Sequence, residues 1–207
     1  MIERTLALFE DPGPQNTNAT LQAAADRAKT LGIRQVVLAT NTGDTALKAA
    51  RLFQDTKAKI VAVTLQAGRW KVFQAPDPDV VAQAKQLGVV FHTGIHAFRV
   101  NVDSAVTIAY GGLPASELIA RVYYTFSQGV KVAIEVAIMA ADAGLIDVDQ
   151  ELIAIGGTHR GADTALVLNP AYSHQFFNLN VAEVVAMPRR PEKRASRSQE
   201  QPASPKA

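Results

Sequence analysis

The chain has 207 residues, 48% of them hydrophobic, which is enough for one large domain or two small ones with a substantial core. Cysteine is absent, which excludes disulfides, thiolate metal sites and a cysteine nucleophile. The N-terminus predicts no signal peptide, and no apolar stretch approaches the roughly 20 residues that span a bilayer. We therefore expect a cytoplasmic protein with no membrane partner.

The positive charge is concentrated near the C-terminus. Residues 188–207 contain six Lys or Arg and two Glu, leaving 15 of the 21 basic and 17 of the 19 acidic residues for the rest of the chain. This Pro-, Ser- and Arg-rich segment has almost no large apolar side chain. We therefore predict a folded domain over 1–188 and a disordered basic tail over 189–207. The tail is either a solubilising extension or the one part expected to contact nucleic acid, an anionic surface or an acidic partner.

Apolar runs and helical repeats alternate along the first half of the chain. The predicted strands are 5–9, 36–39, 59–64 and 89–91. The predicted helices are 18–30, 44–53 and 79–88, and Gly32 is expected to end the first of them. Strands and helices that alternate at this spacing predict right-handed βαβ crossovers and a parallel, doubly wound sheet.

The second half of the chain is less regular. Residues 93–112 are assigned only as a connection. Helices are predicted over 114–126 and 129–143, and strands over 151–157, 164–168 and 184–187. The first two of these strands are joined by a short turn and must run antiparallel, and we place the last strand at an edge. The predicted fold is a three-layer α/β/α sandwich with a mostly parallel, doubly wound sheet and antiparallel strands at one edge.

Loops rich in small and polar residues follow the predicted strands. In a doubly wound sheet, ligands bind beyond the carboxyl ends of the parallel strands. The loops expected there are EDPGPQNT, TNTGDT, TLQAGRW and GGTHRGADT. Small residues let a ligand approach the backbone, and hydroxyl and helix-start N–H groups donate to an anion. At minimum, Thr42 or Asp44 in TNTGDT caps the second helix. This loop has no lysine, which favours holding a phosphate over transferring one.

Three titratable residues are candidates for chemistry. Glu135 lies in the otherwise apolar stretch VAIEVAIMAADAG, where a carboxylate is unfavourable unless it is paired or hydrogen-bonded. It either accepts hydrogen bonds from a ligand or site residue, or holds loop N–H groups. His159 in GGTHRG is the second acid/base candidate. His92 and His96 have the HxxxH spacing of a metal pair, but no third ligand accompanies them and we expect no metal. Neither GxSxG nor GxGxxG is present, so neither an α/β-hydrolase nor a dinucleotide-binding Rossmann protein is indicated.

The stretch VVLATNTGDTALKAARLFQDTKAKIVAVT resembles the start of the C-terminal domain of pyruvate kinases. There, a strand, a Thr/Ser-Gly phosphate loop, a helix and a strand ending in AVT follow one another. Together with DPGPQNT, EVAIMAADAG, GGTHRGADTA and VVAMPR, this makes residues 4–190 similar to the stand-alone pyruvate kinase alpha/beta domain-like proteins of archaea and some bacteria. The resemblance implies a pocket for a phosphorylated ligand, with flavin mononucleotide (FMN) as the cofactor. It implies no pyruvate kinase activity, because 207 residues leave no room for the catalytic barrel.

The residues expected to bind the ligand lie in three loops. They are Asn16, Thr17, Thr40, Asn41, Thr42, Gly43, Thr45, Gly157, Thr158, Arg160 and Gly161. The leading hypothesis is a binding protein for a phosphorylated small molecule. The alternative is a small enzyme that acts on a phosphorylated metabolite with Glu135 or His159 as acid or base. Edge strands and exposed apolar helices also indicate a homo-oligomer, although the sequence does not set the number of subunits.

Overall fold

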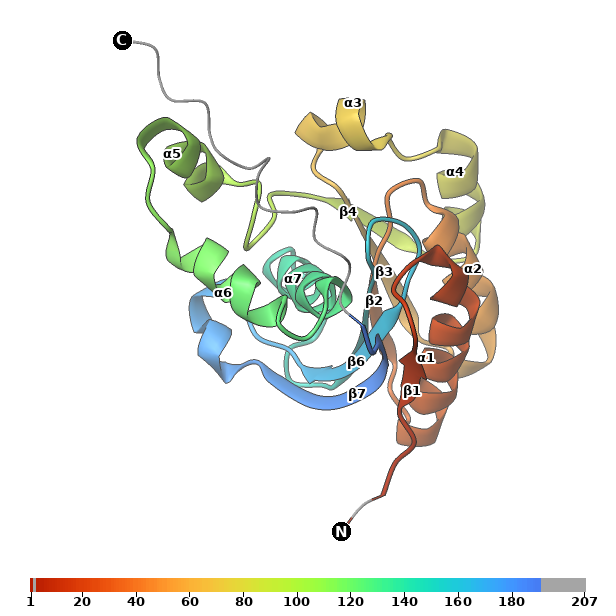
Figure 1. Cartoon of the computed structure of the whole chain (residues 1–207). Coiled ribbons are helices and arrows are strands. Elements are labelled where there is room, and N and C mark those ends of the chain that lie inside the picture. The colour runs from red at the N-terminus through yellow and green to blue at the C-terminus, as the bar shows by residue number, and fades with distance from the viewer. Residues whose placement is uncertain (2, 191–207) are drawn as a thin grey trace.

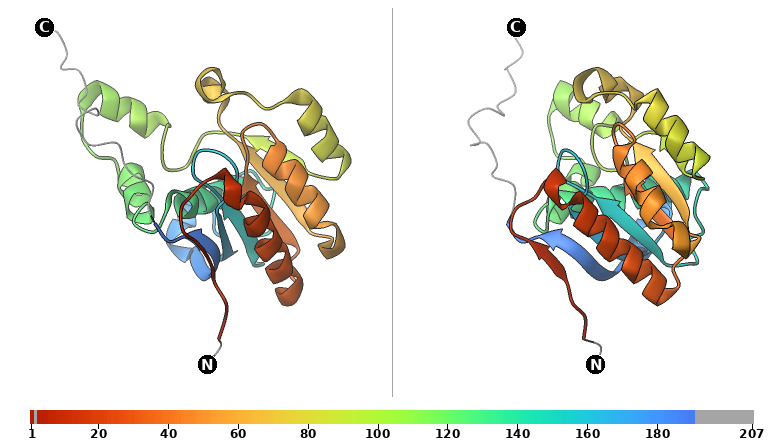
Figure 2. Two further views of the ribbon diagram at one scale, coloured as in Figure 1. Left: turned by 45° about the vertical axis from the view of Figure 1, so that its right-hand side comes forward. Right: turned by 90° about the vertical axis from the view of Figure 1, so that its right-hand side faces the viewer.

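The structure is a computed structural model that describes residue 1 and residues 3–190 (Figure 1). The predicted basic tail therefore lies almost entirely outside the described residues. None of the helices in the described part is long and apolar enough to cross a bilayer. One sheet carries helices on both faces, which confirms the predicted three-layer α/β/α class (Figures 1 and 2).

In the described residues, seven strands form the sheet in the spatial order β1-β7-β6-β5-β2-β3-β4. The strands are β1 (Ala7–Phe9), β2 (Gln35–Ala39), β3 (Lys59–Thr64), β4 (Val90–Thr93), β5 (Leu152–Gly156), β6 (Thr164–Asn169) and β7 (Asn180–Pro188). Strand β6 pairs antiparallel with β5 and β7, and the other pairings are parallel. The prediction of a mostly parallel sheet with an antiparallel component is confirmed.

Two predictions about the edge of this sheet are wrong. The antiparallel strand β6 lies inside the sheet, and β7 inserts between β6 and β1 instead of closing an edge. Ala186 of β7 is in register with Ala7 on one side and Ala165 on the other. Strand β1 is therefore the edge strand at this side. An apolar run looks the same in the sequence whether the strand has one neighbour or two, so the pattern does not fix the strand order.

Seven α-helices and four short 3₁₀ turns connect the strands in the described part of the chain. The helices are α1 (Thr17–Leu31), α2 (Asp44–Leu52), α3 (Trp70–Phe73), α4 (Pro78–Gln86), α5 (Val102–Tyr110), α6 (Ala115–Tyr123) and α7 (Gln128–Asp142). The 3₁₀ turns are η1 (Pro14–Asn16), η2 (Gln54–Thr56), η3 (Ala67–Arg69) and η4 (Ser173–Asn178). Gly32 ends α1 with a left-handed φ of 70°, and its N–H donates to the Ala28 carbonyl, so the predicted C-cap is confirmed.

The assignment of residues 93–112 as a bare connection is wrong, because α5 lies within them. The signal that was missed is Asn101, whose side chain accepts a hydrogen bond from the Ser104 N–H at 3.3 Å and so caps the helix. The apolar residues of α5 do not form a stripe that faces the core. A search for buried helical periodicity therefore passes over this segment.

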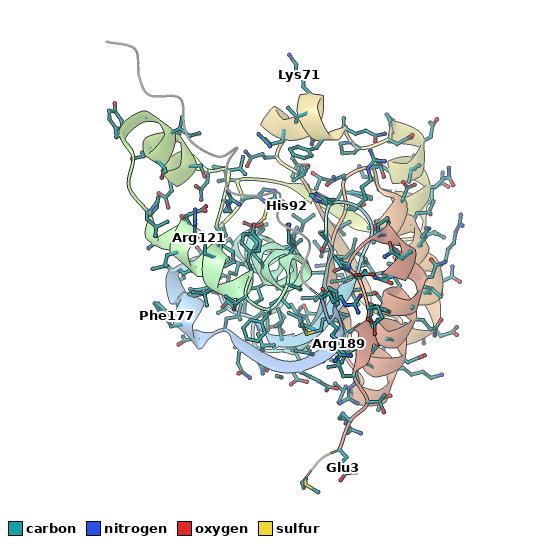
Figure 3. All side chains as sticks on the ribbon, viewed as in Figure 1. Glu3, Lys71, His92, Arg121, Phe177 and Arg189 are labelled. Carbon is teal, nitrogen blue, oxygen red and sulfur yellow. The ribbon has the colours of Figure 1, made fainter. Side chains whose placement is uncertain are left out.

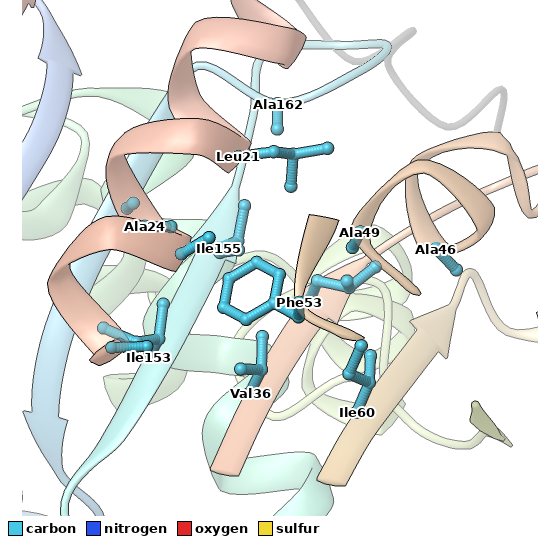
Figure 4. Packing of buried hydrophobic residues seen from close by; sticks show 14 of the residues in the cluster. Leu21, Ala24, Val36, Ala46, Ala49, Phe53, Ile60, Ile153, Ile155 and Ala162 are labelled. Carbon is cyan, nitrogen blue, oxygen red and sulfur yellow. The ribbon is translucent and has the colours of Figure 1, made fainter. Parts of the chain in front are cut away.

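Alternate residues of the central strands enter two separate cores. Val36 and Leu38 of β2 pack with α1, α2 and α4, whereas Val37 packs with α7 on the opposite face. Figure 4 shows Phe53, which follows α2, lying over the sheet between Ile155 and Ile60. Figure 1 shows α1, α2 and α4 on one side of the sheet and α7 on the other.

The topology brings the predicted loops to one edge. Because β1, β2, β3, β4 and β5 run in the same direction, the loops that follow them emerge at the same edge of the sheet. After β2 the chain moves outward to β3, and after β5 it moves outward on the opposite side to β6. The neighbouring strands β2 and β5 therefore form the switch point at which doubly wound folds bind ligands.

Candidate functional site

A cavity of about 680 Å³ opens at this switch point. The loops that follow β1, β2, β3, β4 and β5 all contribute to its lining, as does the first half of α7. Apolar side chains, including Val63, Val132 and Val136, form part of the wall. A cavity of this size, with an apolar part and convergent polar groups, is typical of a small-molecule site.

Most of the predicted site residues line this cavity. Those that do are Thr17, Thr40, Asn41, Thr42, Thr45, Gly157, Arg160 and Gly161, together with the acid/base candidates Glu135 and His159. Asn16, Gly43 and Thr158 do not. The Asn16 side chain turns away and donates to the Asp11 carbonyl at 2.8 Å. Gly43 and Thr158 shape the loops on which their neighbours stand.

The loop after β2 presents the start of α2 to the cavity. Gly43 is the cap residue with a left-handed φ of 107°, and its N–H donates to the Thr40 hydroxyl at 3.1 Å. The predicted cap residues, Thr42 or Asp44, are not the cap residue itself, which is Gly43. The Thr42 hydroxyl nevertheless accepts from the Asp44 N–H at the start of α2 at 3.4 Å and donates to the Asp44 carboxylate at 2.7 Å. The first-turn N–H groups of α2 lack carbonyl partners within the helix.

Thr45 stands in this first turn with its hydroxyl available. The residue is only 6% exposed and lines the cavity. A hydroxyl in the cavity wall can donate to an anion bound there, so Thr45 is placed to contact a ligand.

The loop after β5 is fixed by a fully buried carboxylate. Asp163 accepts hydrogen bonds from the N–H groups of Gly13 and Thr158, both at 3.1 Å, and from the Thr164 hydroxyl at 2.9 Å. These bonds tie the β5 loop to the loop after β1. Gly161 completes the junction with a φ of 70°, and a Cβ there would lie 2.3 Å from the Thr17 hydroxyl oxygen. Only glycine fits this approach.

Thr17 has a structural use at this junction. Its hydroxyl donates to the Pro14 carbonyl at 2.7 Å and accepts from the Ala162 N–H at 3.0 Å. Both bonds hold the β1 and β5 loops together. The hydroxyl is therefore already engaged, and Thr17 contributes to the cavity mainly through its position in the wall.

The cavity lining carries an excess of positive charge. It contains five Lys or Arg and two acidic residues, which gives a net charge of +3 with histidine neutral. The basic residues are Lys48, Arg69, Arg99, Lys131 and Arg160, and the acidic ones are Asp44 and Glu135. Arg99 and Lys131 are paired with Glu117 and Glu135 respectively. In the described part of the chain no carboxylate pairs with Lys48, Arg69 or Arg160, so these three charges are available to an anionic ligand.

Glu135 is held by three donors. Lys131, one turn earlier on α7, donates to one carboxylate oxygen, His96 Nδ1 lies 3.1 Å from the same oxygen, and the Phe98 N–H donates to the other at 3.0 Å. Burial alone would raise the pKa of Glu135, but the hydrogen bond from His96 and the charge of Lys131 outweigh it and lower the pKa to about 2. Glu135 is therefore a carboxylate that positions its neighbours.

This environment disfavours Glu135 as an acid/base catalyst. Efficient proton transfer near neutral pH needs a group whose pKa lies near that pH, and a carboxyl with a pKa of about 2 neither donates nor accepts readily there. His96, which Glu135 orients, leaves its Nε2 buried without a hydrogen-bond partner among the described residues.

His159 stands at a sharp turn in the β5 loop. Its φ of 61° is unusual for a residue other than glycine, and the Arg160 N–H donates to the Thr158 carbonyl across it at 2.8 Å. The turn places His159 and Arg160 at the cavity, with both residues exposed. No group of three or more His, Asp or Glu side chains within residues 1 and 3–190 is arranged to hold a metal ion.

Sequence reasoning missed two lysines of the site. The loop after β2 has no lysine, but Lys48 reaches the cavity from the second turn of α2, three residues after Thr45. Lys131 reaches it from α7, four residues before Glu135. Both spacings place the paired side chains on one face of a helix, and this i, i+3 and i, i+4 relationship was the available signal.

These features define an α/β domain with a cation-rich cavity at the carboxyl edge of its sheet. The family model described as pyruvate kinase, alpha/beta domain, matches residues 18–168, which is well over half of the chain. The chain therefore belongs to the pyruvate kinase alpha/beta domain family.

Solved pyruvate kinase structures give a weaker likeness. A crystal structure of a pyruvate kinase from Cryptosporidium parvum is 16% identical, with 73% of this chain and 22% of that chain covered and a TM-score of 0.36. A structure of Cryptosporidium parvum pyruvate kinase in complex with ADP is 17% identical, with 80% and 24% covered and a TM-score of 0.34. This chain thus spans less than a quarter of the length of those pyruvate kinases.

Proposed function

We propose that this domain acts as a stand-alone binding protein for a phosphorylated small molecule, with FMN as the candidate ligand. The observation that carries the proposal is the charge of the cavity, where the lining has a net charge of +3. Charge-assisted hydrogen bonds from Lys or Arg to phosphate are among the strongest in proteins, and partial burial strengthens them further.

The phosphate is proposed to bind over the first turn of α2. The positive end of the helix dipole, the Thr45 hydroxyl and the side chain of Arg160 then act on the same anion. Asp44 also lines the cavity, but it is exposed and its carboxylate is engaged by Thr42, so the phosphate lies on the side of the N–H groups.

The rest of the ligand is proposed to lie along the apolar wall. Val63, Val132 and Val136 provide surface for a flat ring, and Phe73 borders the same cavity beneath the Arg69 guanidinium, 4.7 Å from the ring centre. An isoalloxazine ring has large apolar faces and a polar edge, which suits a wall of this kind. Lys131 and His96 then supply polar groups beyond the apolar part.

We expect no pyruvate kinase activity from this chain. The described α/β domain is proposed to bind a phosphorylated ligand and to carry out no phosphoryl transfer. The alternative is a small enzyme with Glu135 or His159 as its acid or base. The lowered pKa of Glu135, about 2, disfavours Glu135 in that role and leaves His159 as the acid/base candidate of this alternative.

Calorimetric titration of the purified chain with FMN and with riboflavin tests the proposal. FMN should bind, and riboflavin, which differs only by lacking the phosphate, should bind at least tenfold more weakly, about 1.4 kcal/mol or more. Native mass spectrometry of the freshly purified protein would report any ligand already bound. Equal affinity for FMN and riboflavin would refute a phosphate site, and the absence of any thermal shift with FMN would remove FMN as the ligand.

A further inference from the structure

The helix α5 turns polar side chains toward the protein and leaves large apolar side chains exposed. Its polar residues Asp103, Ser104 and Thr107 are partly buried, whereas Val106 is 48% exposed and Ile108 is 85% exposed. No residue of α5 is buried. A surface helix of a monomer normally turns its apolar residues toward the core. The apolar side chains of α5 are instead left uncovered by the described part of the chain.

The polar side of α5 is held to the molecule by hydrogen bonds. The Asp103 carboxylate accepts from the Ser116 hydroxyl of α6, and the Ser104 hydroxyl accepts from the Val100 N–H at 2.8 Å. Gln66 of the loop after β3 donates to the Val100 carbonyl at 2.6 Å. These bonds fix the orientation of the helix, so its apolar residues face outward as a defined feature of the fold.

The neighbouring helix α6 continues the apolar surface. Ile119 and Ala120 pack toward the core, whereas Leu118, Val122 and Phe126 are each more than half exposed. Leu118 and Val122, four residues apart, lie along one side of α6, and Phe126 lies in the turn just after the helix. In α5, Val102, Val106 and Tyr110 repeat the same spacing. We call residues 101–127 the α5–α6 arm. Figures 1 and 2 show α5 standing off from the sheet and from α7.

We propose that the α5–α6 arm is the interface of a homodimer, with the arm of a second copy of this chain as its occupant. The exposed large apolar side chains of the arm are Val102, Val106, Ile108, Tyr110, Leu113, Leu118, Val122 and Phe126. At about 100 Å² of exposed surface each, they offer on the order of 800 Å², which is what one partner contributes to a stable interface.

Two arms can cover each other without a further component. In a two-fold interface each helix hairpin meets its own copy, and two antiparallel hairpins pack as a four-helix unit. A permanently exposed apolar surface needs a partner that is present whenever the chain is made, and another copy meets that condition. The residues beyond 190 contain no Leu, Ile, Val, Phe, Met, Tyr or Trp, so their composition does not suit this surface.

The charge of the arm argues against a membrane as the occupant. Helices that lie in a membrane interface are rich in Lys and Arg on their polar face. Residues 101–127 contain a single basic residue, Arg121, against Asp103 and Glu117. Figure 3 shows Arg121 on α6 at the periphery of the molecule, and its guanidinium pairs with Glu117 at 3.1 Å. The arm is therefore apolar and slightly acidic, which suits a protein–protein contact better than an anionic lipid surface.

Sedimentation of the full chain tests this proposal. The wild type should sediment at twice its monomer mass of 22.1 kDa, and a Leu118→Glu/Val122→Glu variant should sediment as a monomer. Because both side chains are more than half exposed in the single chain, the variant should keep the circular dichroism spectrum of the wild type. The matched control is Leu87→Glu, since Leu87 is 44% exposed at the end of α4, outside the arm, and its substitution should leave the dimer intact.

Cysteine trapping provides a second readout that does not depend on disrupting the contact. The chain has no cysteine, so Ile108→Cys introduces a single thiol. Under oxidation it should give a covalent dimer, and Leu87→Cys should not. A wild type that sediments as a monomer, a dimer that persists in the Leu118→Glu/Val122→Glu variant, or a monomer that sediments with lipid vesicles would each overturn the proposal.

Discussion

Lys131 and Glu135 form an ion pair one turn apart on α7, and their side chains are only 6% and 1% exposed. Two charges are unfavourable in such a place unless each is fully satisfied. Glu135 meets this requirement through Lys131, His96 and the Phe98 N–H, so the pair joins α7 to the segment that follows β4. This carboxylate therefore fixes one wall of the cavity.

Glu135→Gln should reduce the free energy of unfolding by about 3–5 kcal/mol at pH 7, because it leaves the buried Lys131 ammonium unpaired. Urea denaturation monitored by circular dichroism measures this loss. The control is Glu183→Gln, which breaks the more exposed ion pair with Arg27 and should cost about 1 kcal/mol. Equal losses of unfolding free energy in the two variants would show that burial does not increase the contribution of the Lys131–Glu135 pair to stability.

The same pair predicts a pH dependence. The pKa of Glu135 is lowered in the folded protein from 4.5 to about 2, so the unfolded chain binds the proton more readily. Its contribution to stability is therefore complete above pH 4.5 and is lost as the pH falls from 4.5 toward 2. This contribution amounts to about 3 kcal/mol and should be missing from Glu135→Gln. The difference in unfolding free energy between wild type and Glu135→Gln should thus shrink across this range, and a constant difference would contradict the assigned pKa.

The class of fold and the position of the cavity were predictable from local signals. Strand–helix alternation indicates parallel crossovers, and parallel strands deliver their loops to one edge. Thr40 and Arg160 lie in such loops, Thr45 lies in the helix turn that follows the first of them, and all three line the cavity. Each of these inferences needs only the order of elements along the chain.

The features that were missed depend on relations between distant segments. The place of β7 between β1 and β6 is set by long-range pairing, and His96 lies 39 residues from the carboxylate that it contacts. The helix α5 was missed because helix prediction looks for an apolar face that is buried against the core, and no residue of α5 is buried. Lys48 was the exception, because its spacing from Thr45 on α2 was readable in the sequence.

We expect the Asp163 carboxylate to order the loop after β5 through its hydrogen bonds. Asp163→Ala leaves the N–H groups of Gly13 and Thr158 without an acceptor, and each unsatisfied buried group costs about 1–3 kcal/mol. Asp163→Asn keeps an oxygen for both N–H groups and should cost only about 1 kcal/mol.

Hydrogen exchange at residues 157–161 should increase strongly in Asp163→Ala and little in Asp163→Asn. Asp147→Ala serves as the control, since Asp147 is an exposed turn residue that accepts from the Asp149 N–H. Similar exchange in the two Asp163 variants would mean that the hydrogen bonds do not order this loop.

Gly161→Ala should reduce the free energy of unfolding more than Gly144→Ala, although the two glycines have similar left-handed φ angles. Gly144 has a φ of 66° with nothing within 4 Å of an added Cβ, so Gly144→Ala should cost about 1 kcal/mol. Gly161 has nearly the same φ, but its Cβ would also lie 2.8 Å from the Pro14 Cα. We expect an additional loss of about 2 kcal/mol from this overpacking, measured as the difference in unfolding free energy. Equal losses would show that the β1 and β5 loops separate freely.

Thr45→Val is the most direct test of where the phosphate of the proposed ligand binds. Valine keeps the shape of threonine and removes only the hydroxyl. A hydrogen bond to a charged group is worth about 1.5–3 kcal/mol, so the dissociation constant for FMN should rise about ten- to a hundredfold. Riboflavin binding should not change, because riboflavin has no phosphate.

The control for Thr45→Val is Thr30→Val, which removes an exposed hydroxyl at the end of α1 that donates to the Asp26 carbonyl. It should leave FMN affinity unchanged. If Thr45→Val weakens FMN and riboflavin equally, Thr45 contacts the ring instead of the phosphate. If it changes neither affinity while FMN still binds more tightly than riboflavin, the phosphate lies away from the first turn of α2. Lys48 and Arg69, the other unpaired cations of the described lining, would then be the residues to replace.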